Sequence, residues 1–121
     1  MFQIILNEIS AAEISQLPTP TQLELLNEFQ VSPEDLENID GDKFGRMERE
    51  GKTLYRYRAK DVRIYFEVTN ENSVLVHRVL HKNTFSDFLF RTNLPLSEDD
   101  QLSESKQFWE LIEEGEKARR V

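Results

Sequence analysis

Residues 51–91, GKTLYRYRAKDVRIYFEVTNENSVLVHRVLHKNTFSDFLFR, carry the pattern that decides the fold of this 121-residue chain. Apolar and polar side chains alternate in TLYRYR (53–58) and in VRIYFEV (62–68), and a third β-rich run, SVLVHRVLH (73–81), follows. A period of two is typical of strands that bury one face. The short connections AKD (59–61) and TNEN (69–72) are typical of hairpin loops. The stretch therefore predicts a three-stranded antiparallel meander.

The residues before the meander predict one strand and several helices. FQIIL (2–6) is short and apolar, as buried strands are, and KFGRME (43–48) is a weaker strand pattern. Apolar spacing predicts one amphipathic helix that ends before Pro18 and a second that runs from near Thr21 to near Val31. In SPED (32–35), Ser32 is predicted to cap a short helix that continues through Ile39.

These elements predict an α+β fold in which helices cover one face of a β-sheet. An antiparallel β-sheet is expected to be covered on one face by the N-terminal helix hairpin. The sheet residues expected under this cover are Tyr55, Tyr57, Ile64 and Phe66. We expect residues 1–91 to form this domain and residues 92–121 to form an acidic C-terminal extension with a helix at about 103–119.

The composition excludes several classes of protein. The chain has 38% hydrophobic and 31% charged residues, which is typical of a single globular domain with a solvated exterior. The absence of Cys excludes disulfides, thiolate catalysis and cysteine-ligated metals. No long apolar window and no secretory leader is recognised, so we expect a cytoplasmic protein. No phosphate loop, HExxH, GxSxG or EF-hand pattern is present, and no cofactor or metal is predicted.

The net charge of −8 is unevenly distributed along the chain. Residues 1–41 carry eight acidic and no basic side chains, residues 42–91 carry eleven basic and seven acidic ones, and residues 92–121 carry eight acidic and four basic ones. This pattern indicates either one modestly basic surface framed by acidic ones or charges that only solubilise the helices.

The alternation of the two central strands places three arginines on the face opposite the apolar set. Arg56, Arg58 and Arg63 share that face with Tyr65 and Glu67. Three guanidiniums on an exposed sheet face are a candidate binding site for phosphate or carboxylate, because each stays charged and offers a fork of donors. The alternative is cross-strand pairing with Glu67 and solvation.

The two histidines and the paired acids are weaker candidates for chemistry. His77 and His81 are four residues apart on one predicted strand, hence on one face and about 13 Å apart, too far to chelate one metal. One of them would serve as an acid or base, or would be a partly buried, hydrogen-bonded side chain. Asp99 and Asp100 are expected on a solvated face.

YRYRAKDVRIYFEV (55–68), followed by VLVHRVLHK (74–82), resembles the core signature of the RelE/ParE toxin superfamily. The resemblance covers about residues 50–90. It implies ribosome-dependent cleavage of mRNA, as in RelE-type members, or action on DNA gyrase, as in ParE-type members. Arg63 falls on the family's hairpin-exit arginine, Arg56 on a basic strand position and Lys82 on the basic residue after the last strand. The resemblance implies that these three hold the scissile phosphate, with His81 as a substitute proton carrier.

Three departures from the family pattern change the expected function. Leu54 stands where RelE-type members have a second lysine, Phe88 stands where they have a tyrosine, and the acidic chain would repel RNA. The predicted function is therefore a protein-binding regulator of RNA metabolism, whose partner is an RNA-processing or translation component or a cognate antitoxin. The alternative is an mRNA interferase of a toxin–antitoxin system, an endoribonuclease that contacts RNA through the basic sheet face.

The C-terminal helix provides a second candidate binding surface. Phe108, Trp109 and Ile112 lie on or near one side of it. They are predicted either to anchor a protein partner or to pack as part of the core.

Overall fold

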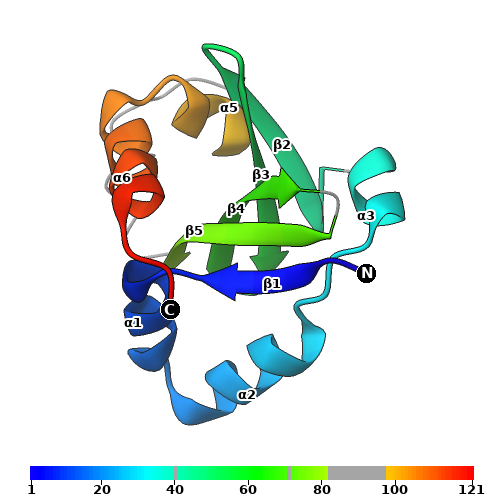
Figure 1. Cartoon of the computed structure of the whole chain (residues 1–121), viewed down its shortest axis with the longest axis vertical. Helices are drawn as coiled ribbons and strands as arrows, with labels where there is room; N and C mark the ends of the chain where they lie inside the picture. The colour runs from blue at the N-terminus through cyan, green and yellow to red at the C-terminus, as the bar shows by residue number, and fades with distance from the viewer. Residues whose placement is uncertain (40, 71, 82–97) are drawn as a thin grey trace.

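The computed structural model describes residues 1–39, 41–70, 72–81 and 98–121 (Figure 1). Its elements follow one another in the order β1 (Gln3–Leu6), α1 (Glu8–Ser15), α2 (Thr19–Glu28), α3 (Pro33–Glu37), β2 (Phe44–Arg49), β3 (Lys52–Ala59), β4 (Val62–Asn70), β5 (Ser73–His81), α5 (Glu98–Ser103) and α6 (Lys106–Lys117). The strands form one five-stranded sheet with the order β1-β5-β4-β3-β2. The predicted meander is formed by β3, β4 and β5, which pair antiparallel.

Two parts of the predicted fold class are wrong. The sheet is mixed rather than antiparallel, because β1 runs parallel to β5. The predicted helix hairpin is not formed either: within the described residues α1 packs on β5 and β1, and α2 does not pack along α1. The helices that follow the strands, α5 and α6, pack on β2 and β5. The structure is α+β, with helices on both faces of the sheet (Figure 1).

The sheet separates two hydrophobic cores, as the alternation of its strands requires. The first core, with the N-terminal helices, contains Leu25, Val31, Phe44, Tyr57, Val62, Ile64, Phe66, Val74, Val76 and Val79. The second core, with α5 and α6, contains Met47, Leu54, Tyr65, Leu80, Leu102, Phe108, Trp109 and Ile112. The predicted alternation is confirmed for Tyr57, Ile64 and Phe66, but the opposite face is also buried rather than exposed.

Local capping signals explain where several helices begin. Asn7 and Ser10 form a capping box at the start of α1, and Ser32 and Asp35 form the predicted one at the start of α3. α2 starts at Thr19, earlier than predicted. Pro20 is tolerated in its first turn, because the backbone N–H groups there have no partner within the helix, so the N–H that proline lacks is not missed. The helix predicted at about 103–119 corresponds to α6, which Ser105 caps, and α5 is an additional helix before it.

A β-bulge in β5 changes which face its later residues occupy. Tyr65 pairs with Arg78 and Phe66 pairs with Val76, so β5 carries one extra residue at His77. As a result His77 faces α6, whereas His81 lines a cleft on the α2 side. The prediction that His77 and His81 share one face is wrong for this reason.

Candidate functional site

Arg56, which the resemblance places in a phosphate cradle, is fully buried and donates hydrogen bonds to Asp99 and to two backbone carbonyls. Its Nε and Nη2 donate to the two carboxylate oxygens of Asp99, each at 3.0 Å. Its Nη1 donates to the carbonyl of Asp42 at 2.8 Å, and Nη2 donates to that of Gly41 at 2.9 Å. A bidentate pair of this kind fixes geometry as well as charge. Arg56 therefore joins β3, the turn before β2 and the start of α5.

The Arg56 site depends on Gly45 and Asp99, neither of which the sequence analysis placed beside Arg56. A Cβ at Gly45 would overlap the Arg56 guanidinium and the Asp99 carboxylate, so any other residue there would have to displace this ion pair. Asp99 was predicted on a solvated face, and that prediction is wrong because its carboxylate turns inward to Arg56. No local sequence signal distinguishes Asp99 from Asp100, because the partner lies 43 residues away.

The other predicted arginines lie at the β3–β4 hairpin, where Arg58 and Arg63 face each other in register. Arg58 Nη1 lies 3.4 Å from Asp42 Oδ1. Arg63 Nη1 donates to the carbonyls of Lys60 and Val62. The three arginines therefore do not converge on one exposed face, since Arg56 lies inside the protein. Lys82, the remaining residue of the predicted cradle, and Phe88 lie outside the described residues.

A cleft of about 480 Å³ lies beside this hairpin. Its titratable lining residues are Glu24, Glu28, Lys43, Tyr57, Arg58, Lys60, Asp61 and His81. Lys60 Nζ lies 3.2 Å from Glu24 Oε2, so part of the positive charge is neutralised within the cleft. Burial, and to a lesser extent the charge of Glu28, raises the pKa of the Tyr57 hydroxyl above its ordinary value. The cleft thus has both signs of charge and a hydroxyl that stays protonated.

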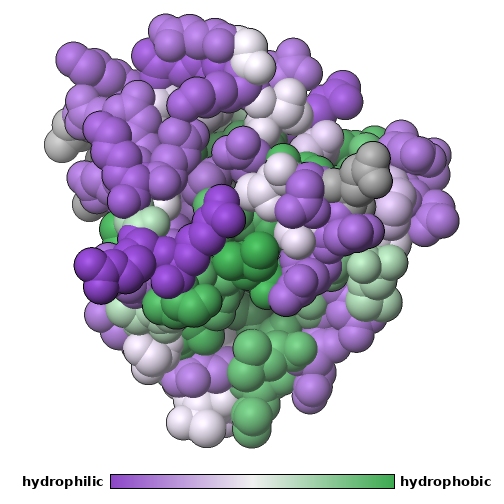
Figure 2. Space-filling view, in the orientation of Figure 1, coloured by the Kyte–Doolittle hydropathy of each residue, from purple (hydrophilic) through white to green (hydrophobic). Residues whose placement is uncertain are grey.

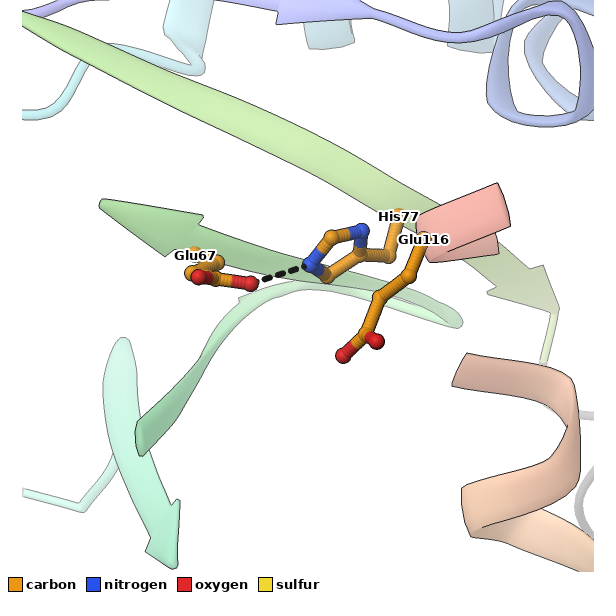
Figure 3. Close-up of side chains that lie close together, drawn as sticks. All are labelled: Glu67, His77 and Glu116. Carbon is orange, nitrogen blue, oxygen red and sulfur yellow. Dashed lines mark hydrogen bonds and ion pairs between the residues drawn. The ribbon is translucent and has the colours of Figure 1, made fainter. Parts of the chain in front are cut away.

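Glu67, His77 and Glu116 form a second titratable cluster, between β4, β5 and α6 (Figure 3). His77 Nε2 lies 2.9 Å from Glu67 Oε2, and the buried Nδ1 has no hydrogen-bond partner among the described residues. Glu116 Oε2 accepts from Lys52 Nζ at 2.9 Å. This hydrogen bond and the charge of Glu116 raise the pKa of Lys52 above its ordinary value.

The same cluster has the residue types of a metal site, since its three ligand atoms lie within 4.8 Å of one another. A zinc ion would require each of these ligand atoms to lie about 2.0–2.2 Å from the metal. It would also have to displace the Lys52 ammonium, which already neutralises Glu116. The cluster is therefore best described as a hydrogen bond between His77 and Glu67 that joins β5 to β4, beside a Lys52–Glu116 ion pair that joins α6 to β3.

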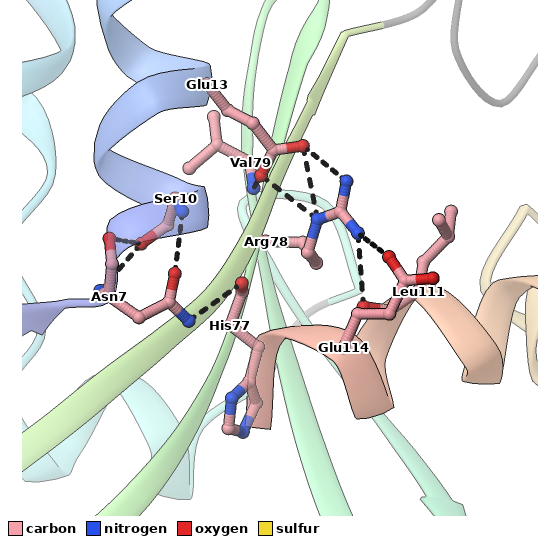
Figure 4. Close-up of polar contacts among 8 residues, drawn as sticks. All are labelled: Asn7, Ser10, Glu13, His77, Arg78, Val79, Leu111 and Glu114. Atoms are coloured by element: carbon pink, nitrogen blue, oxygen red, sulfur yellow. Dashed lines mark hydrogen bonds and ion pairs between the residues drawn. The ribbon is translucent and has the colours of Figure 1, made fainter. Parts of the chain in front are cut away.

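A polar network connects α1, β5 and α6 at the bulge (Figure 4). The side-chain amide of Asn7 donates to the carbonyl of His77 at 3.1 Å and to that of Gly115 at 2.8 Å. Arg78 donates to both carboxylate oxygens of Glu13, the shortest contact being 2.8 Å, and also to Glu114 on α6. These hydrogen bonds hold α1 and α6, which lie on opposite faces of the sheet, to the same strand, β5. Their role is structural.

The candidate surface on the C-terminal helix is part of the core. Phe108 and Ile112 are 0% and 1% exposed, and Trp109 is 6% exposed. Trp109 Nε1 donates to the carbonyl of Ser103 at 2.8 Å. The prediction that these three residues anchor a partner is wrong, and the alternative that they pack as core is the observed arrangement.

No family model and no curated protein matches this chain. Among the described residues, no helix is both long enough and apolar enough to cross a membrane.

Proposed function

We propose that this chain is a RelE-like cytoplasmic protein that regulates RNA metabolism by binding a protein partner, rather than an efficient ribonuclease. The partner would be an RNA-processing or translation component, or a cognate antitoxin. The observation that carries the proposal is the placement of Arg56. This guanidinium is fully buried and uses four of its five N–H donors on Asp99 and two carbonyls, so a scissile phosphate has no access to it.

The distribution of charge supports the same proposal. The first 41 residues have eight acidic and no basic side chains, and the whole chain has a net charge of −8. Binding to RNA at physiological salt depends on cations that release counterions from phosphates. An acidic surface instead favours encounter with a basic protein surface.

One observation favours the alternative, an mRNA interferase. The cleft beside the β3–β4 hairpin brings His81 together with Lys43, Arg58 and Lys60. A histidine among cations is a plausible acid or base near a phosphate. In this alternative, His81 acts at the cleft, Arg63 acts from the adjoining β3–β4 hairpin, and Arg56 supports the fold.

Controlled expression of the chain in a bacterial host separates the two functions. For the regulator we expect normal growth, intact ribosome-bound mRNA and stoichiometric capture of an RNA-processing or translation protein by the tagged chain. Growth arrest with cleaved mRNA, both lost in Arg63→Ala, would overturn the regulator and establish the interferase. Arg119→Ala, at an exposed arginine near the C-terminus, is the matched control for the loss of one positive charge.

A further inference from the structure

β2 is the edge strand of the sheet on the side opposite β1 (Figure 1). Just before it, the carbonyl of Lys43 accepts from the backbone N–H of Arg58 at 2.9 Å. Backbone groups point to alternate sides along an antiparallel strand, so the odd-numbered residues of β2 bond to β3. The N–H and C=O groups of Arg46 and Glu48 therefore point outward, away from the sheet.

This outward side of β2 is open in its middle. At the start of the strand the carbonyl of Phe44, which also points outward, accepts from the N–H of Gly41 at 3.0 Å. At the end of the strand the chain turns at Glu50, whose φ is 52°. Between these two positions, the backbone groups of Arg46 and Glu48 have no partner within the residues that the structure describes. Another strand can pair with an edge of this kind.

The side chains at this open edge are charged rather than apolar. Figure 2 shows hydrophilic residues over α5 and the tip of the β2–β3 hairpin, whereas hydrophobic residues gather over β1 and α2. The side chains of Arg46 and Glu48 are 55% and 66% exposed, and their charged atoms lie 4.0 Å apart, at the long end of ion-pair distances. Such an exposed contact contributes little stability, so both side chains remain available to a partner strand.

Two copies of this edge are complementary when they pair antiparallel about a two-fold axis at Met47. Arg46 of each copy then lies opposite Glu48 of the other. Both members of each such pair have outward backbone groups, so they can exchange their N–H···O=C hydrogen bonds. Their opposite charges lie on the same face of the joined sheet, where cross-strand pairs attract. A two-fold axis makes each of these contacts occur twice.

The two charges also select this register over its neighbours. The partner strand can shift only in steps of two residues if outward groups are to meet outward groups. One such shift places Arg46 opposite Arg46, and the other places Glu48 opposite Glu48. Like charges directly opposite each other are destabilising. Charged residues on an edge commonly prevent pairing with other chains. Here they oppose the shifted alignments and favour the central one.

We propose that the open edge of β2 pairs with the same edge of a second copy of this chain and joins the two sheets into one. The contact consists of backbone hydrogen bonds and ion pairs between Arg46 of each copy and Glu48 of the other. Because the turns at Gly41 and Glu50 confine it to a short stretch, the dimer is weak and depends on concentration. This inference is independent of the proposed function, since neither Arg46 nor Glu48 lines the cleft beside the β3–β4 hairpin.

Sedimentation of the full-length chain between about 1 μM and about 1 mM tests the proposal. We expect a monomer–dimer equilibrium. Glu48→Arg and Arg46→Glu each place like charges opposite one another and should weaken the dimer at least about tenfold. An equimolar mixture of these two variants should regain dimerisation, because every arginine then meets a glutamate across the edge. Glu110→Arg, at an exposed position of α6, is the matched control, since it changes the net charge by the same amount as Glu48→Arg and should leave the dimer intact.

Hydrogen exchange resolved by residue provides a second measurement. As the protein concentration rises, the N–H groups of Arg46 and Glu48 should become protected. The N–H of Met47 already bonds to β3 and should be protected at every concentration. This alternation distinguishes pairing along the edge from association through side chains alone.

Four results would overturn the proposal. The first is a monomer at every concentration, and the second is equal dimerisation of Glu48→Arg and Glu110→Arg. The third is a mixture of Glu48→Arg and Arg46→Glu that dimerises no better than either variant alone. The fourth is new protection on another element while the outward N–H groups of β2 stay unprotected, which would assign self-association to a different surface. Recovery in the mixture also shows that the two charge variants are folded.

Discussion

Arg56 on β3 and Asp99 on α5 form a buried bidentate ion pair, in which the arginine side chain is 0% exposed and both carboxylate oxygens accept a hydrogen bond at 3.0 Å. The pair joins the sheet to the first C-terminal helix. Arg56, which the resemblance assigned to a phosphate cradle, therefore supports the packing of α5 on the sheet.

Asp99→Asn should destabilise the protein by about 3–5 kcal/mol, because it leaves the Arg56 guanidinium buried without its counter-charge. The free energy of unfolding in urea measures this effect. Glu104→Gln, at an exposed acid just after α5, is the control and should change stability by less than about 0.5 kcal/mol. Equal effects of the two substitutions would show that the ion pair carries no net stability.

Asn7→Ala should cost about 2–4 kcal/mol of unfolding free energy. It removes the α1 cap and leaves the carbonyls of His77 and Gly115 without their side-chain donor. Asn27→Ala, at an exposed position of α2, is the control and should be nearly neutral. Hydrogen exchange adds a second measurement: protection should fall in both α1 and α6, and loss confined to α1 would contradict the bridging role.

Gly115→Ala should destabilise the protein by about 1–3 kcal/mol, although alanine is the better helix former. The added Cβ would overlap the backbone carbonyl of His77, so α6 would have to move away from β5. Glu113→Ala, on the exposed side of the same helix, should be neutral or slightly stabilising. Thermal unfolding compares the two variants, and a stabilised Gly115→Ala protein would contradict the observed close approach.

The stability of the protein should fall above pH 10, partly because of Tyr57. Burial raises the pKa of its hydroxyl above the ordinary value of 10.0, so the unfolded chain loses this proton first. The stabilising contribution is fully present below pH 10.0 and is lost as the pH rises through the raised folded-state pKa. Tyr57→Phe should flatten the alkaline part of a melting-temperature profile, whereas Tyr55→Phe should leave it steep. An unchanged alkaline profile in Tyr57→Phe would rule out this source of the pH dependence.

Sequence and structure agree where a signal is local and differ where it is not. Ser32 was identified as a helix cap because its partner, Asp35, is three residues away. His77 and His81 were assigned to one face because the residues of a regular strand alternate between its two faces. The bulge that breaks this alternation is not marked by any characteristic residue type in the sequence. The inward turn of Asp99 could not be predicted, because its partner is distant in sequence.

The sequence by itself determined the meander of β3, β4 and β5, the alternation of β3 and β4 and the start of α3, because hydrophobic period, turns and caps act over a few residues. Only the tertiary structure decided that β1 pairs parallel with β5, that α5 and α6 bury the second face, and that Arg56 is structural. These outcomes depend on contacts between segments tens of residues apart. Such contacts are selected by the packing of the whole core and leave no local pattern in the chain.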